Sequence, residues 1–389
     1  MKSSSVTYKN LATLFQNRVY RNEDDIAITR QLGKTQIALT WSEVGDAVRE
    51  VGRVLLHLGV APGERVGIYS ENRPEAAIAE IASLSIGALT VLCLPDEPVD
   101  GIVRLLASQE TRVVFVSHRE RLDALTNKRK DLPRLQTIIS MDDDVSNDAE
   151  GVETLSILRG RAKAVPAASF YERLEAIGSE TVCTVLHPEK SDLRDPVKLN
   201  HSQLLAGCKA IIEAFPVLAN DIHFSLLPLA GPFARVFGLY SVLYLGSRVA
   251  YPSDIRDPYT DLTALSPTVL TASPTALHRI RDHYLEAINQ KPSPLRYLYR
   301  RVLGPNPAPS DPANVSPTGD TFIGRLLLPK IRKWLGGNLR MVVCVGDLLN
   351  DETRQFFRLL GVDVYETKPS NGDHLQFSFS SIERQTNKI

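Results

Sequence analysis

One loop of this chain has residue types that could meet a charged ligand. It spans residues 187–196, HPEKSDLRDP, between an expected strand at 181–186 and a helix that begins near Asn200. In α/β proteins that handle nucleotides, a loop in this place is normally glycine-rich, because its N–H groups close on phosphate oxygens while a lysine adds positive charge. This loop has no glycine. Its acidic residues are Glu189, Asp192 and Asp195, and Pro188 and Pro196 each lack an N–H donor. We expect it to repel a polyphosphate.

The segments around the loop follow a recognisable pattern. Residues 39–60 are LTWSEVGDAVREVGRVLLHLGV, residues 227–235 are LPLAGPFAR, and residues 330–340 are KIRKWLGGNLR. Together with Leu199 and His201 after the loop, they resemble the adenylate-forming (AMP-binding) superfamily, and most closely its long-chain acyl-CoA synthetases. The resemblance covers nearly all of residues 11–366.

The resemblance implies that the loop has lost its function. Anchored on Leu199 and His201, it aligns without a gap on the family's phosphate motif, Thr-Ser-Gly-Thr-Thr-Gly-x-Pro-Lys-Gly, and keeps none of its residues. Asp195 stands where the family has lysine. Two unit charges about 6 Å apart interact with roughly 3 kcal/mol at an effective dielectric of ~20. Reversing that charge therefore costs about two decades in phosphate affinity.

Other functional positions of the family differ here too. Gly231 and Ala234 stand at the family's histidine and glutamate near the acyl pocket, although neighbouring positions match: Leu227, Pro228, Leu229, Phe233 and Arg235. The family's Tyr-Gly-x-Thr-Glu, whose ring packs on adenine and whose glutamate helps to hold magnesium, aligns with KPSNG at 368–372. We therefore assign no catalytic, cofactor-binding or metal-binding residue.

Alternating apolar segments predict an α/β fold with two parallel-sheet lobes covered by helices. The first lobe is expected over 1–175, the second over 176–370, and a polar tail over 371–389. Residues 142–168 are polar and are expected to form an irregular connection. By resemblance, this is the front part of the synthetase N-terminal domain. By the same resemblance, we expect the family's β-rich subdomain and mobile C-terminal domain to be absent.

Composition limits the classes of function. The 389 residues are 43% hydrophobic and 23% charged, as in a soluble globular protein, and 45 basic residues balance 45 acidic ones. Nucleic acid is therefore not an expected partner. The four cysteines are too far apart in sequence to suggest a zinc site or a disulfide framework. With no apolar signal core and no transmembrane run, we expect a cytoplasmic protein, either free or peripheral to a membrane.

Three functional hypotheses remain open. The first is a catalytically inactive relative (a pseudoenzyme) that acts as a binding, scaffold or regulatory subunit, with a protein partner or a second copy covering apolar surface. The second is an active ATP-dependent fatty acyl ligase that uses magnesium and substitute groups, or a partner chain; the substitutes would be His187, Lys190, Arg194 and Arg235. The third is a non-catalytic acyl or lipid binder with an apolar pocket formed by Leu229, Phe233, Val236 and Phe237.

Overall fold

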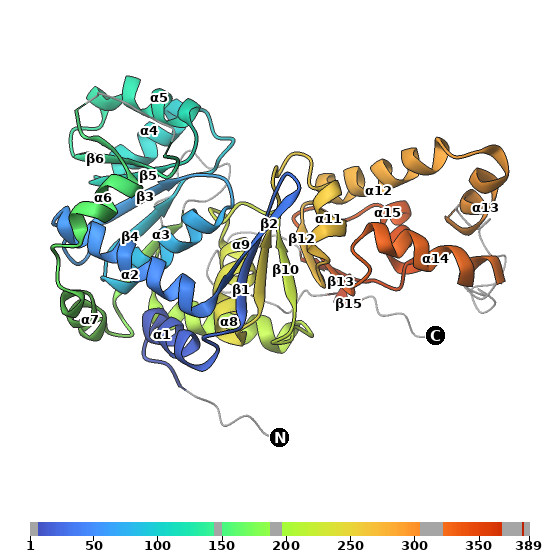
Figure 1. The fold of residues 1–389 in the computed structure, drawn as a ribbon, viewed down its shortest axis with the longest axis horizontal. Coiled ribbons are helices and arrows are strands. Elements are labelled where there is room, and N and C mark those ends of the chain that lie inside the picture. The colour runs from blue at the N-terminus through green and yellow to red at the C-terminus, as the bar shows by residue number, and fades with distance from the viewer. Residues whose placement is uncertain (1–6, 144–149, 187–196, 304–321, 368–382, 385–389) are drawn as a thin grey trace. The chain divides into compact units, whose positions relative to one another are not determined.

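The computed structural model describes residues 7–143, 150–186, 197–303, 322–367 and 383–384, and the chain divides into two compact units (Figure 1). The first unit comprises Met1–Thr29, Ala38–Ala219 and Pro228–Arg248. The second comprises Arg30–Ile37, Asn220–Leu227 and Val249–Ile389. The boundary expected between residues 175 and 176 lies inside the first unit.

The first unit is built on a seven-stranded sheet. Its strands, in spatial order, are β7 (Val152–Thr154), β6 (Thr137–Ser140), β5 (Val113–Val116), β3 (Arg65–Tyr69), β4 (Leu89–Leu92), β8 (Val182–Leu186) and β9 (Val197–Asn200). Neighbouring strands are parallel except for the antiparallel pair β8 and β9. Every residue of β4 and β5 is buried, as expected when both faces of a parallel sheet are covered.

Helices of the first unit are α1 (Leu11–Arg21), α2 (Trp41–His57), α3 (Pro74–Ser85), α4 (Val99–Ser108), α5 (Arg119–Asn127), η1 (Arg129–Asp131), α6 (Leu155–Ala162), α7 (Ala167–Ala176), α8 (His201–Ala214), α9 (Pro232–Arg235), the π-helix η2 (Val236–Tyr240) and α10 (Ser241–Leu245). Local sequence explains several boundaries. Thr40 and Glu43 form a capping box at the start of α2, and Asn200 caps α8 in the same way. Gly59, at φ +70°, follows the end of α2 in a conformation that suits glycine.

The second unit contains most of an eight-stranded sheet. Its spatial order is β15 (Glu383–Arg384), β14 (Asp363–Thr367), β13 (Met341–Val345), β12 (Val269–Ala272), β10 (Ile222–Ser225), β11 (Arg248–Tyr251), β1 (Ile26–Leu32) and β2 (Thr35–Thr40). β10, β12, β13 and β14 pair in parallel with their neighbours in this run, and β15 is antiparallel to β14. The helices are α11 (Tyr259–Leu265), α12 (Pro274–Asn289), α13 (Ser293–Leu303), α14 (Phe322–Trp334) and α15 (Asp351–Leu359).

The predicted α/β class is confirmed, and one prediction about its connections is wrong. Residues expected to form an irregular connection at 142–168 instead contain β7, α6 and the start of α7. Thr154 caps α6, and Leu155, Leu158 and Ala162 are buried at helical spacing. The polar residues between them obscured this pattern. β9 was also not anticipated, because a four-residue strand depends on its partner β8 rather than on its own composition.

Candidate functional site

The glycine-free loop begins where β8 ends, at Leu186, and β9 follows it at Val197. The loop itself, with the proposed substitute groups His187, Lys190 and Arg194, lies outside the described residues. Two described threonines lie on β8, which precedes the loop, and on its neighbour β4. Thr184 of β8 is the register partner of Thr90 on β4, and the Oγ1 atoms of these two residues are 3.0 Å apart. Both side chains are buried, so the loop follows a polar spot inside the sheet.

Arg235, the last residue of α9, lies beside this spot and is 1% exposed. Its Nη1 donates to Oγ1 of Thr184, and its Nε donates to the carbonyl of Leu229 at 2.8 Å. Its Nη2 donates to the carbonyl of Ala230 at 3.4 Å. The guanidinium is therefore used inside the first unit to hold the turn before α9 against β8.

Glu80 of α3 is a fully buried carboxyl group in the same network. Tyr240, at the end of the π-helix, donates its hydroxyl to Oε1 of Glu80, and Thr90 does so at 3.2 Å. Oε2 of Glu80 has no hydrogen-bond partner within the described part of the chain. Burial raises the pKa of Glu80, and the charge of Arg235 opposes this shift only in part. Relative to an exposed glutamate, burial therefore shifts Glu80 toward its protonated form.

The residues of the predicted acyl pocket lie before α9, in α9 and in the π-helix that follows it. Phe237 is stacked on Phe233 with ring centroids 5.4 Å apart, and its edge meets Phe215 at 5.2 Å. Leu229, Val236 and Phe237 are buried, while Phe233 is half-buried. The structure therefore brings the four predicted residues into one short region, where aromatic rings pack on each other. An extra residue in a π-helix often marks a functional position, and whether this region admits an acyl chain stays a prediction.

A second polar cluster, which the sequence did not reveal, lies at the carboxyl ends of β3, β5 and β6. Glu71 accepts hydrogen bonds from Ser117 Oγ at 2.6 Å and from Arg121 Nη1 at 2.5 Å, and its Oε1 is 2.9 Å from His118 Nε2. On its other side, His118 Nδ1 is 3.1 Å from Asp142 Oδ2. His118 and Asp142 thus connect the segment after β5 with the segment after β6.

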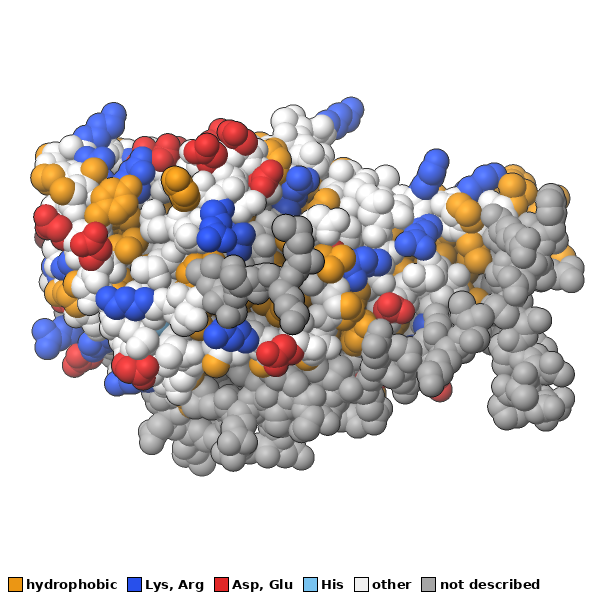
Figure 2. Space-filling model, turned by 90° about the horizontal axis from the view of Figure 1, so that it is seen from below, with side chains coloured by type: hydrophobic (Ala, Val, Ile, Leu, Met, Phe, Trp, Pro, Cys, Tyr) orange, Lys and Arg blue, Asp and Glu red, His pale blue; other side chains and the backbone are white. Residues whose placement is uncertain are grey.

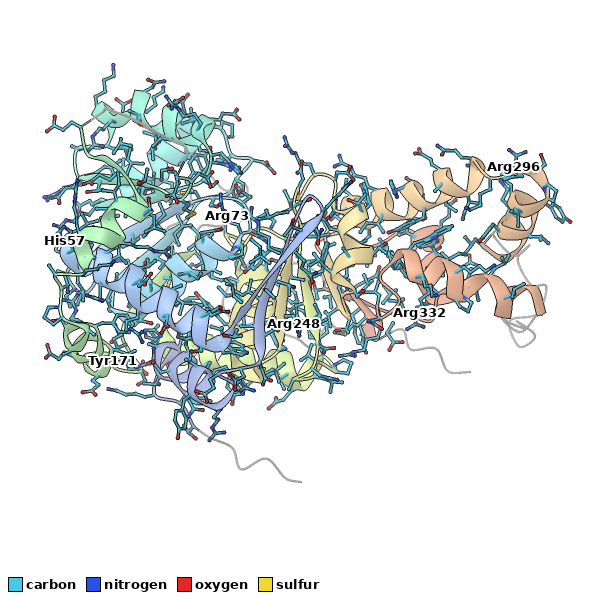
Figure 3. All side chains as sticks on the ribbon, in the orientation of Figure 1. His57, Arg73, Tyr171, Arg248, Arg296 and Arg332 are labelled. Atoms are coloured by element: carbon cyan, nitrogen blue, oxygen red, sulfur yellow. The ribbon has the colours of Figure 1, made fainter. Side chains whose placement is uncertain are left out.

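Arg73, labelled in Figure 3, joins the same cluster and is 5% exposed. It contacts Glu75 and Asp142, each at 2.7 Å. Although burial opposes ionisation, the bond from Ser117 and the charges of His118 and Arg121 hold the pKa of Glu71 below its ordinary value. Ligands of parallel α/β sheets bind at this edge. Here the basic and acidic side chains of the cluster already pair with one another. No group of three side chains that could hold a metal ion occurs among the described residues.

In the second unit, Glu366 near the end of β14 is, among the described residues, the acidic residue closest in sequence to the expected magnesium motif. Its Oε1 accepts from the backbone N–H of Leu349 at 2.8 Å and from Arg354 Nη2 at 3.0 Å. The side chain is buried, so its role is to tie β14 to the start of α15. The aligned motif positions 368–372 lie outside the described residues.

Comparison with known proteins identifies the family. A family model described as AMP-binding enzyme matches residues 15–183 and 196–367, which is most of the chain. The chain belongs to the AMP-binding enzyme family. The match is interrupted at residues 184–195, which include nearly all of the glycine-free loop.

Members of the AMP-binding family with sequence similarity include long-chain ligases. Long-chain-fatty-acid–CoA ligase 5 of Rattus norvegicus is 26% identical over 356 residues, which are 84% of this chain and 49% of the ligase. The FadD15 ligase of Mycobacterium tuberculosis is 24% identical over 366 residues, 92% of this chain and 60% of that protein. The chain thus spans about half to three-fifths of the length of these relatives.

Solved structures of AMP-binding enzymes share the fold. The A-PCP didomain of carboxylic acid reductase from Segniliparus rugosus, in complex with AMP, superimposes with a TM-score of 0.74 at 15% identity, covering 94% of this chain and 53% of that one. The N-terminal domain of FACL13 from Mycobacterium tuberculosis gives 0.69 at 13% identity, covering 93% and 76%. At these identities the similarity establishes the fold alone.

The described residues of this AMP-binding family member do not fit ATP and magnesium well. Of the residues proposed to replace the phosphate motif, Arg235 is the one within the described part of the chain. All three of its side-chain nitrogens already donate hydrogen bonds to groups in the protein interior. The carboxylate of Glu366 is likewise engaged by Leu349 and Arg354. We therefore derive no reaction step through a bound nucleotide. His201, which follows the loop, accepts from the N–H of Leu11 at 3.3 Å, and burial lowers its pKa to about 4, so it is a neutral structural residue.

Proposed function

We propose that this chain is a catalytically inactive member of the AMP-binding family that acts as a binding, scaffold or regulatory subunit. The observation that carries the proposal is the interrupted family match at 184–195. In that interval the chain has acidic residues and prolines and no glycine. A phosphate loop needs closely spaced N–H donors and a net positive charge, whereas here two prolines remove donors and three acidic residues outnumber Lys190 and Arg194.

The environment of Arg235 supports the same proposal. A guanidinium that binds phosphate must direct its donors toward the ligand. Arg235 instead donates to Thr184, Leu229 and Ala230 and is almost fully buried. Turning it outward would leave the hydroxyl of Thr184 and two carbonyl groups without this donor. Such a change costs several kcal/mol in total, at about 1–3 kcal/mol per buried group.

Selective loss of chemistry fits a retained binding role. The caps of α2 and α8 and the buried strands of both sheets are intact. A chain under no selection for any function would be expected to lose these caps and buried strands together with the phosphate loop. We infer that the scaffold is kept because a protein partner or a second copy of this chain uses it, and that no nucleotide cofactor is required.

Isothermal titration calorimetry with ATP and magnesium tests the proposal. The FadD15 ligase serves as the positive control, and we expect no heat of binding for this chain under conditions in which the control binds. Micromolar binding of ATP to this chain would refute the proposal. Light scattering at several protein concentrations then separates a homodimer from a monomer that requires another partner.

The names of the relatives favour a second candidate, an active ATP-dependent fatty acyl ligase. This candidate requires His187, Lys190 or Arg194 to replace the phosphate motif, since Arg235 is buried. Formation of palmitoyl-hydroxamate from palmitate, ATP and hydroxylamine would establish it. Loss of that product in a Lys190→Ala/Arg194→Ala variant would then locate the substitute groups.

A further inference from the structure

The helical pair formed by α13 and α14 has an unusual charge. Its sequence contains seven basic residues and neither aspartate nor glutamate: Arg296, Arg300, Arg301, Arg325, Lys330, Arg332 and Lys333. The whole chain has no net charge, so this excess is local. The two helices lie side by side at one end of the second unit (Figure 1).

One face of the pair anchors it to the core of the second unit. Leu327, Ile331 and Tyr299 are buried, and the ring of Tyr299 is stacked on Trp334 with centroids 6.0 Å apart. Arg332, labelled in Figure 3, also faces inward, because it donates to the carbonyls of Gly337, Leu339 and Leu360. The pair is therefore a fixed part of the unit.

The opposite face combines basic and apolar side chains. On α14, Leu326 is 56% exposed and is followed at i+4 and i+7 by the exposed Lys330 and Lys333. On α13, Tyr297 is 65% exposed and Arg300 is exposed at i+3. This spacing places each apolar side chain on the same side of its own helix as its basic neighbours, and we call these exposed side chains of the two helices the stripe. Figure 2 shows blue and orange side chains intermixed over the right-hand part of the molecule, which these helices help to build.

Among the described residues, the arginines of α13 donate to neutral groups. Arg300 donates to the amide oxygen of Asn289, and Arg296 donates to Asn289 and Ser293. Within the described ranges, no ion pair joins Arg296, Arg300, Lys330 or Lys333 to a carboxylate. The stripe therefore presents positive charge beside exposed apolar groups.

We propose that the stripe formed by Tyr297, Arg300, Leu326, Lys330 and Lys333 docks the protein on an anionic lipid bilayer. Basic side chains are attracted to acidic headgroups, and an exposed tyrosine and leucine between them can enter the interfacial region. The apolar component favours a lipid surface over a purely ionic partner. This interaction needs neither ATP nor catalysis, so it stands independently of the proposed inactivity.

Vesicle co-sedimentation of the full chain tests the proposal. We expect binding to phosphatidylcholine vesicles that contain about 30 mol% phosphatidylserine, and at least tenfold weaker binding to phosphatidylcholine alone. Raising the salt from roughly 0.1 M to 0.5 M should release the protein, because screening weakens the headgroup attraction. Absence of binding to the anionic vesicles at low salt would overturn the proposal.

Matched variants locate the surface. Lys330→Glu/Lys333→Glu should weaken binding by about 30-fold or more, since each basic residue near the membrane is worth about fivefold. Lys34→Glu/Lys163→Glu changes two exposed lysines in other segments by the same charge and should retain binding within about threefold. Equal losses in both variants would contradict a local site. Tyr297→Ala/Leu326→Ala should weaken binding severalfold without altering net charge. Tight binding to duplex DNA without binding to vesicles would reassign the stripe to nucleic acid.

Discussion

The guanidinium of Arg235 donates to the hydroxyl of Thr184, two residues before β8 ends and the glycine-free loop begins. A cation next to that loop could have compensated for the missing phosphate motif. Instead, it is enclosed between α9 and β8 and belongs to a network that reaches Glu80 and Tyr240 through the two threonines. This network stabilises the first unit, so loss of the hydrogen bonds from Arg235 should lower the free energy of unfolding.

Replacing Arg235 by methionine should destabilise the protein by about 3 kcal/mol or more. The apolar stem would remain, but the hydroxyl of Thr184 and the carbonyls of Leu229 and Ala230 would lose their hydrogen-bond donor. Urea unfolding followed by circular dichroism measures the change. Arg104→Met, at an exposed position of α4, is the matched control and should cost less than about 0.5 kcal/mol. A loss below about 1 kcal/mol for Arg235→Met would mean that the network is not coupled as described.

Substitution of Glu80 by glutamine should alter the pH dependence of stability. Because burial raises the pKa of Glu80 above its ordinary 4.5, its contribution is fully present below that value and is lost as the pH rises through the raised pKa. Glutamine can keep bonds to Tyr240 and Thr90 without carrying a charge. The variant should therefore gain in melting temperature relative to the native protein as the pH rises above the ordinary value of 4.5. The exposed Glu213→Gln controls for a surface charge effect. An unchanged pH profile in Glu80→Gln would argue against a protonated carboxyl group.

The cluster around Glu71 should respond to pH in the opposite direction. Its pKa is lowered, so its contribution is present above the ordinary 4.5 and is lost as the pH falls through the folded value. Glu71→Gln should cost about 2 kcal/mol at neutral pH, with a smaller difference in acid. Asp123→Asn removes the partner of Arg119 in an exposed helix pair and should cost less than about 0.5 kcal/mol. Equal costs for the two variants would show that the cluster contributes no more than a surface pair.

The aromatic region of the π-helix separates a packed core from an acyl pocket. Phe237→Ala removes a fully buried ring that contacts Phe215 and Phe233, and it should lower stability by about 3–5 kcal/mol. In the native protein, we expect palmitate to produce no shift in melting temperature. A shift of several degrees that disappears in Phe233→Trp, or fatty acid co-purifying in mass spectrometry, would instead support the pocket formed by Leu229, Phe233, Val236 and Phe237.

Much of the secondary structure followed from nearby residues. The capping box of Thr40 and Glu43 is encoded in four consecutive residues, because both of its hydrogen bonds are made within one turn. Helix α3 begins at Pro74, and proline suits the first position of a helix. The missed elements β7 and β9 are short, and each depends on hydrogen bonds to another strand.

The sequence by itself determined the α/β class, the family resemblance and the unsuitable composition of the loop at 187–196, because these depend on local patterning and residue identity. Only the tertiary structure decided that Arg235 faces the interior, that Glu80 shares a buried hydrogen bond with Tyr240, and that Glu71, His118 and Asp142 meet. Glu80 and Tyr240 are 160 positions apart. Such pairings arise from the packing of whole elements, and no periodicity within either segment encodes them.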